Sequence, residues 1–313
     1  MKYKNLCKKI KLPLVNFYNE IYDLNKIRNI ILYNYFHRVL KFKPKIMTIE
    51  ESLKYLINNR CSLGRFGDGE MKIIRGESLP FQEYSPELKS RLTEVLKSKK
   101  NNFKVGIPDV FESLRGIKYS DREFWEKNMK KNRDVWYEYL DKNTKYINSF
   151  ITRPYIIFKN TSKSEFYFEL IKKIWKDKDI IIIEGEESRL GVGNDLFDNV
   201  KSIERILAPS ENAFSIYNDI LEFAKKLPKN KMILIALGPA ATVLAYDLSV
   251  IGYQAIDIGH IDLEYEWYLL KATKKINLDN KYVHEIKEGR NALPIYDKKY
   301  NNEIIYHLKN KNC

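Results

Sequence analysis

Short apolar runs alternate with amphipathic segments through the second half of the chain, and this pattern constrains the fold more than any other feature. Four runs have the length and composition of buried strands, namely 179–185, 202–209, 231–238 and 253–259. The segments 212–227 and 239–252 between them are helical in length and pattern. Apolar strands separated by helices of about 10–15 residues are typical of βαβ units. We therefore expect an α/β protein with a Rossmann-like, mostly parallel sheet covered by helices on both faces.

The first half of the chain continues the alternation from residue 47 onward. Its predicted helices are 49–59, 70–76, 85–98 and 121–145, and its predicted strands are 61–66 and 103–108. The pattern divides the chain into a basic helical extension (1–46), one main domain (47–290) and a C-terminal tail (291–313).

Positive charge is concentrated at the N-terminus. The formal net charge is +14, and residues 1–46 contain 11 basic and 2 acidic side chains. This extension would suit peripheral contact with an anionic membrane or another polyanion. It would equally suit packing on the main domain or on a second subunit of an oligomer, and a general bias toward Lys, Asn and Ile explains the charge as well. No nucleic-acid-binding motif accompanies it, so we expect no nucleic-acid partner.

Compartment signals are few. Three widely spaced cysteines, Cys7, Cys61 and Cys313, argue against a disulfide framework or a cysteine zinc site. No stretch has the roughly 20 apolar residues of a membrane span, and the N-terminus lacks a secretory signal. The sequence therefore predicts a cytoplasmic protein, at the inner face of the membrane if the extension contacts lipid.

Glycine-rich, polar segments follow four of the predicted strands. They are GDGE after 61–66, EGEESRLGVGND after the strand at 179, GPAAT after the strand at 231, and GHIDLEYEW after the strand at 253. Ligands of open α/β sheets bind beyond the carboxyl ends of the strands. We therefore expect these four segments to meet in one site.

In the first segment, Gly67 and Gly69 flank Asp68 and let the backbone turn sharply before Glu70. If the segment is extended, the two carboxylates lie about 6–7 Å apart. Their repulsion would be about 2.5 kcal/mol at an effective dielectric constant near 20, against about 0.6 kcal/mol in water. A partly buried pair calls for a cation, and Mg²⁺ or Mn²⁺ fits because no Cys or His lies nearby. The alternative is a solvated turn, with Glu70 as an acid in the first turn of a helix.

The other segments supply groups for binding and proton transfer. Gly238 and Pro239 mark a strand-to-helix turn that either binds an anion or only packs tightly. In the loop after 179–185, phosphate would pair with Arg189, and ribose hydroxyls would bond to Asn194 or Glu186.

The last segment carries the candidate catalytic residues, which are His260, Asp262, Glu264 and Glu266. If a helix starts there, Asp262 and Glu266 share one face, and one of these groups would act as a general base. The alternative is a structural histidine beside ordinary core packing.

Several blocks in this order resemble the GT-D glycosyltransferases, a bacterial family once catalogued as a domain of unknown function. The resemblance covers roughly residues 50–290. Its blocks are RFGDGE, GIPD, FITRPY, EGEESRLGVGNDLFDN, APSENAF, LIALGPAATVLAYDL and GYQAIDIGHIDLEYEW.

The resemblance implies one Rossmann-like domain that binds a nucleoside-diphosphate sugar, typically a UDP-sugar, with Mn²⁺ or Mg²⁺ on Asp68 and Glu70. The sugar would pass to a glycan or glycoprotein acceptor in surface-polysaccharide assembly or adhesin glycosylation. The donor pocket would be formed by the residues that match the remaining blocks: Arg65, Glu186, Arg189, Asn194, Ser210, Gly238 and Pro239. Two alternatives stay open: a metal-dependent nucleotide-sugar hydrolase or phosphotransferase, and a non-enzymatic basic module that binds membranes or polyanions.

Overall fold

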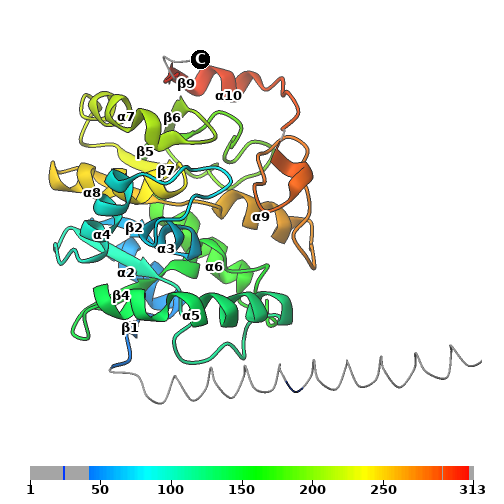
Figure 1. Ribbon diagram of the computed structural model, residues 1–313. Helices are drawn as coiled ribbons and strands as arrows, with labels where there is room; N and C mark the ends of the chain where they lie inside the picture. The colour runs from blue at the N-terminus through cyan, green and yellow to red at the C-terminus, as the bar shows by residue number, and fades with distance from the viewer. Residues whose placement is uncertain (1–23, 25–41, 291, 310–313) are drawn as a thin grey trace, which may run out of the picture.

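The computed structural model describes residues 24, 42–290 and 292–309. Nine strands of this part form a single sheet in the order β1-β4-β3-β2-β8-β7-β5-β6-β9 (Figure 1). Every neighbouring pair runs parallel, which confirms the predicted α/β class. The strands are β1 (Lys45–Ile46), β2 (Ser62–Arg65), β3 (Phe103–Ile107), β4 (Lys145–Asn148), β5 (Asp179–Gly185), β6 (Ser202–Ala208), β7 (Met232–Ala236), β8 (Gln254–Asp257) and β9 (Ile304–His307).

The described helices are α2 (Ile49–Asn58), α3 (Asp68–Ile74), α4 (Pro86–Leu96), α5 (Tyr119–Tyr139), α6 (Ser164–Trp175), α7 (Tyr217–Ala224), α8 (Pro239–Val250), α9 (Ile261–Leu269) and α10 (Lys298–Glu303), with short 3-10 turns η1 (Ser149–Thr152), η2 (Ala213–Ile216) and η3 (Lys287–Arg290). Six of the described helices lie on segments predicted as helices, whereas α6 and α10 have no counterpart in the sequence prediction. Local chemistry sets several of their starts. Ser85 caps α4 by accepting from the Leu88 N–H, and Thr48 and Glu51 form a capping box at α2.

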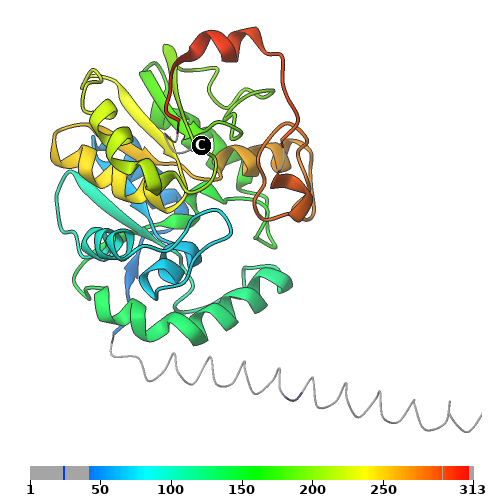
Figure 2. The same cartoon turned by 45° about the horizontal axis from the view of Figure 1, so that its top comes forward.

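The strand order and the right-handed crossover rule assign each helix to a face of the sheet. A helix whose following strand lies nearer the β1 edge of the sheet than its preceding strand is on one face, and α4, α5, α7 and α8 are such helices. A helix whose following strand lies nearer the β9 edge is on the other face, and α2, α6 and α9 are such helices. Packing agrees, because α8 contacts both α4 and α7, and α2 contacts α6. Figures 1 and 2 show α7 and α8 on one side of the sheet and α9 on the other.

The core lies between these layers, and β5 runs through it. Residues Ile180, Ile181, Ile182 and Ile183 are 0% exposed, as expected of a strand covered on both faces. Helix α8 is buried on nearly every side because it packs against β2, β8 and α4. Two of the glycine-rich loops thus follow or precede firmly packed elements, β5 and α8.

Three short strands are absent from the sequence prediction. The predicted helix 121–145 ends at Tyr139, and Lys145 begins β4, which is too short for its own alternating pattern. Strand β1 pairs with β4, and β9 pairs with β6 at the opposite edge. The described part of the predicted tail therefore completes the sheet. Most of the predicted extension lies outside the described residues, and among the described helices none is long and apolar enough to cross a bilayer.

Candidate active site

A cavity of about 350 Å³ lies at the carboxyl end of the sheet. Its walls come from the segments that follow β2, β4, β5, β6, β7 and β8, together with the loop 79–81 and residues 282–285. All four glycine-rich segments contribute lining residues, so the convergence predicted from the sequence is found in the fold. This is the place where open parallel sheets bind ligands.

Asp68 and Glu70 both line this cavity, but the segment is not extended. Gly67 is the N-cap of α3, and both acids lie in its first turn, where the positive end of the helix favours carboxylates. Glu70 Oε2 accepts a hydrogen bond from the Gly67 N–H at 2.7 Å, and Asp68 Oδ2 lies 2.9 Å from Lys72 Nζ. The expectation of an extended acidic pair is therefore wrong, and the first-turn alternative describes the backbone.

Burial raises the pKa of Glu70 to about 7, and repulsion from Asp257 and Asp68 adds to the effect, although the hydrogen bond from Gly67 opposes it. A carboxyl whose charged form is disfavoured by burial and by neighbouring acids gains from a nearby cation. The donor set of two carboxylates beside a cavity thus fits a hard divalent ion.

Arg65 reaches the cavity from the end of β2 and ties it to β8. Its Nη2 and Nε donate to Asp257 Oδ1 and to the Asp257 carbonyl at 2.7 and 2.8 Å, and its Nη1 donates to Thr152 Oγ1 at 2.7 Å. Gly259 has φ +43°, and a Cβ built there would lie 1.9 Å from Arg65 Nη2. Only glycine leaves room for this guanidinium at residue 259. The contacts of Arg65 with Asp257 thus join the ends of β2 and β8 at the cavity wall.

Beyond Arg65, the wall is formed by His260, His284 and Glu285, a group drawn from α9's N-cap and the loop after α9. His260 Nε2 lies 3.0 Å from His284 Nδ1. Burial holds the pKa of His260 well below its usual range and lowers that of His284 to about 4. Arg153 pairs with Glu285, and although burial opposes it, Arg153, His260 and Lys275 lower the pKa of that carboxyl.

Of this group, the sequence pattern indicates His260 alone. His284, Glu285 and Arg153 are far from it in the chain and belong to no recognised spacing. The FITRPY block that contains Arg153 was a signal, but it did not show which residues Arg153 contacts.

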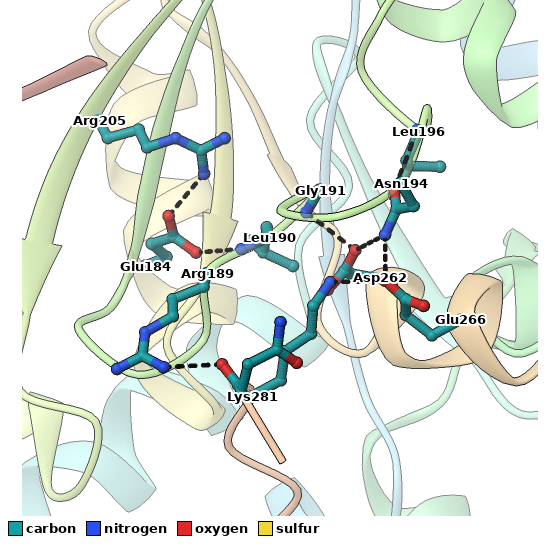
Figure 3. A network of polar contacts seen from close by, with 11 residues as sticks. Glu184, Arg189, Leu190, Gly191, Asn194, Leu196, Arg205, Asp262, Glu266 and Lys281 are labelled. Atoms are coloured by element: carbon teal, nitrogen blue, oxygen red, sulfur yellow. Dashed lines mark hydrogen bonds and ion pairs between the residues drawn. The ribbon is translucent and has the colours of Figure 1, made fainter. Parts of the chain in front are cut away.

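Asp262, Glu266 and Asn194 form a buried network with Lys281 (Figure 3). Lys281 Nζ donates to Asp262 Oδ2 at 2.6 Å and to Glu266 Oε1 at 3.0 Å, and Asn194 Nδ2 donates to the same two carboxylates at 2.8 and 2.7 Å. The Gly191 N–H donates to Asp262 Oδ1 at 2.8 Å. The two acids do share a helix face, as predicted.

These contacts argue against the predicted catalytic role of Asp262 and Glu266. Their oxygens anchor the loop after β5 and the segment that holds Lys281 to α9. For the same reason Asn194 does not face the cavity and its amide is not free for ribose. Asp262 contributes to the cavity wall, whereas Glu266 does not.

Glu264 lies behind the wall and is 0% exposed. Its Oε2 accepts from the Ile156 N–H at 3.0 Å, and Oε1 lies 3.8 Å from Arg153 Nη1. Burial raises its pKa to about 7, although Arg153 opposes this. The contacts make Glu264 a positioning residue for Arg153.

The remaining predicted donor-pocket residues divide into two groups. Ser210, Gly238 and Pro239 line the cavity, with Gly238 at φ +54° and pressed against the Phe81 ring. Glu186 and Arg189 do not line it. Glu186 pairs with His307 at 2.9 Å, and the Arg189 guanidinium donates to the carbonyls of Asn280 and Leu293.

A buried ion cluster closes the base of the loop that carries Arg189. Arg205 Nη1 donates to Glu184 Oε1 and its Nε donates to Glu303 Oε2, both at 2.7 Å. Glu184 Oε2 accepts from the Leu190 N–H at 2.8 Å (Figure 3). Glu184 and Glu303 thus fix β5 and α10 to β6 rather than facing the cavity.

A second cavity of about 560 Å³ adjoins the first. Six residues line both: Asp68, Trp125, Phe150, Arg153, His284 and Glu285. Phe124, which is 43% exposed, and three lysines of the segments 118–121 and 273–275 border the second cavity alone. The site therefore has two compartments with a common wall, which suits a reaction between two substrates.

Comparisons with known proteins identify the family and the fold. A family model described as the glycosyltransferase GT-D fold matches residues 63–286. The probable glycosyl transferase Gly of Streptococcus gordonii is 40% identical over 264 residues, which are 84% of this chain and 39% of that protein. The glycosyltransferase GlyD of Streptococcus pneumoniae is 38% identical over 267 residues, which are 85% of this chain and 33% of that protein. The chain thus spans well under half the length of these relatives.

Solved structures are similar over most of their length. A structure of the domain of unknown function 1792, described as having a distinct glycosyltransferase fold, is 42% identical and has a TM-score of 0.81. The match covers 84% of this chain and 95% of that structure. A structure described as a new glycosyltransferase with the same domain, from Streptococcus sanguinis, is 38% identical and has a TM-score of 0.81. The match covers 85% of this chain and 100% of that structure.

Proposed function

The chain belongs to the GT-D family of glycosyltransferases, and from this premise we propose that it transfers a sugar from a nucleoside-diphosphate sugar, of the UDP class, to a hydroxyl group of a glycan or glycoprotein. The observation that carries the proposal is the two-compartment site at the carboxyl end of the sheet. The first compartment holds the acidic pair and the start of α8, and the second adjoins it across Asp68, His284 and Glu285.

The first compartment suits the donor. Its wall includes Gly238 and Pro239, the N-cap and the first residue of α8, where the positive end of the helix dipole lies. Such a helix start binds phosphate oxygens. From the wall of the same cavity, Asp68 and Glu70 would hold Mn²⁺ or Mg²⁺, whose charge would offset the repulsion that Asp257 and Asp68 exert on the Glu70 carboxylate. The chemistry that such an ion supplies when bound is neutralisation of the charge that develops on the departing diphosphate.

The second compartment suits the acceptor. Phe124 and Trp125 offer aromatic surface to a sugar ring, and an acceptor bound there would direct its hydroxyl toward the common wall. Arg153, held between Glu285 and Glu264, keeps this wall in place. Holding both substrates in adjoining compartments lowers the entropic barrier to their reaction.

The physiological acceptor in this proposal is a surface polysaccharide or an adhesin, as in the family resemblance. Peripheral membrane contact through residues 1–46 and oligomerisation stay predictions.

Isothermal titration of UDP with and without Mn²⁺ tests the donor site. We expect Mn²⁺ to strengthen UDP binding to the unmodified chain, and Asp68→Asn or Glu70→Gln to remove at least about 10-fold of this gain, or about 1.4 kcal/mol. Transfer should fall with it while the circular dichroism spectrum is retained. Glu77→Gln is the matched control, because Glu77 is an acid near the end of α3 that pairs with Lys131 outside the cavity.

Two results would contradict the proposal. One is UDP affinity that does not change with Mn²⁺ or with either variant. The other is release of free sugar from the donor at the same rate with and without glycan acceptors, which would identify a hydrolase.

A further inference from the structure

His260, His284 and Glu285 bring three potential metal ligands together in the cavity wall. His260 is placed by the end of β8, whereas His284 and Glu285 belong to the loop that follows α9. One ligand atom from each residue lies within 4.8 Å of the other two. This cluster is distinct from the acidic pair, because neither Asp68 nor Glu70 belongs to it.

The two imidazoles are spaced as ligands of one ion would be. His260 Nε2 and His284 Nδ1 lie 3.0 Å apart. Two nitrogens that each bind a metal at about 2.1 Å are about 3.0 Å apart at a right angle and about 3.4 Å apart in a tetrahedron. At this contact one nitrogen donates a proton and the other accepts it. To bind an ion, the donating ring takes its other tautomer, with the proton on the nitrogen that faces away, so no net proton is lost.

Glu285 supplies an oxygen that lacks a hydrogen bond. Its Oε1 pairs with Arg153, which fixes the carboxylate, whereas its Oε2 is buried and accepts no hydrogen bond. Lys275 Nζ lies 3.1 Å from Oε2, and the same ammonium lies 3.8 Å from Asp121 Oδ1. A small movement of Lys275 toward Asp121 would therefore leave Oε2 to an incoming cation without leaving the lysine unpaired.

We propose that His260, His284 and Glu285 bind a divalent transition-metal ion, such as Zn²⁺ or Co²⁺, at the wall shared by the two compartments. Two imidazoles and one carboxylate favour such ions over Mg²⁺, which prefers oxygen ligands. Because His284 and Glu285 line both cavities, an ion held there would be accessible from them. The proposal goes beyond the nucleotide site and does not depend on it.

Titration of the full chain with Co²⁺, followed by its visible absorption, tests this site without substrate. We expect binding of one ion that excess Mg²⁺ does not displace. His284→Gln and His260→Gln should each weaken it by at least about 10-fold, because loss even of groups around the ligands has this effect. The matched control is His307→Gln, since His307 lies at the surface beside Glu186.

Asp68→Asn separates this site from the donor site, and it should keep the Co²⁺ spectrum while losing the Mn²⁺ effect on UDP. X-ray absorption of the Co²⁺-loaded, unmodified chain should show two imidazole ligands, and this measurement stands even if a histidine variant does not fold. The proposal is overturned by a bound Co²⁺ with only oxygen ligands, by affinity that both histidine variants retain, or by no binding at millimolar Co²⁺.

Discussion

Removing the buried ammonium of Lys281 should destabilise the fold strongly. Lys281 is 1% exposed, and its Nζ contacts Asp262 Oδ2 at 2.6 Å and Glu266 Oε1 at 3.0 Å. Lys281→Met keeps an apolar chain of similar length but leaves two carboxylates without their cation. Loss of one partner of a buried pair costs about 3–5 kcal/mol, because the remaining charge stays buried. We expect the free energy of unfolding to fall by that amount.

Urea unfolding followed by circular dichroism and tryptophan fluorescence measures this loss. Lys201→Met is the matched control, because Lys201 pairs with Asp179 at 3.0 Å but its side chain is 68% exposed. Such an exposed pair contributes about 0.2–1 kcal/mol.

The double variant Lys281→Met/Asp262→Asn tests the cause. Asparagine keeps an oxygen for the Gly191 and Asn194 donors but carries no charge, so it should recover about 1–3 kcal/mol of the loss. A loss for Lys281→Met no larger than that of Lys201→Met, or no recovery in the double variant, would refute the assignment of Asp262 as a structural anchor.

Two further predictions concern the cavity wall. Gly259→Ala should lower the free energy of unfolding by about 2–4 kcal/mol, because alanine is strained at φ +43° and its Cβ displaces the Arg65 guanidinium. The control Gly252→Ala, at φ +92° with open space around the new Cβ, should lower it by only about 1–2 kcal/mol. Equal losses of the two variants in urea unfolding would show that the clash with Arg65 is not the cause. Glu264→Gln should gain stability relative to the unmodified chain as the pH rises. The pKa of Glu264 is about 7 in the folded state and 4.5 in the unfolded state, so the folded state binds the carboxyl proton more tightly. Protonated Glu264 therefore stabilises the fold by up to about 3 kcal/mol at low pH, and this stabilisation is lost as the pH rises from 4.5 to about 7. Melting curves from pH 4.5 to 8 check this against the exposed Glu83→Gln, and parallel pH profiles for the two variants would contradict it.

Much of the site could be predicted because backbone patterns are local. The apolar run 179–185 coincides with β5, and the turn Gly238–Pro239 begins α8 where proline favours a helix start. Once a parallel sheet is expected, the rule that ligands bind at its carboxyl ends brings the glycine-rich loops together. The class of ligand followed from the family resemblance rather than from the spacing of any one motif.

The partners of individual side chains could not be predicted in this way. Asp262 and Glu266 have the residue type and place of a general base, but Lys281, in a loop of no regular pattern, lies against both. Glu70 was expected to face a metal, and its hydrogen bond to Gly67 emerges only from the helical backbone. In both cases the hydrogen-bond partner of the carboxylate, Lys281 or the Gly67 N–H, is set by the fold and not by the local sequence pattern.

The sequence by itself determined the strands and helices around the glycine-rich loops, the parallel class of the sheet and the edge at which the ligand-binding loops gather. These follow from periodic burial and from turn residues, which act within a few positions along the chain. Only the tertiary structure decided that His260 meets His284 and that Arg153 pairs with Glu285. Such contacts join residues many positions apart, and their geometry depends on the packing of several loops at once, which no short stretch of sequence encodes.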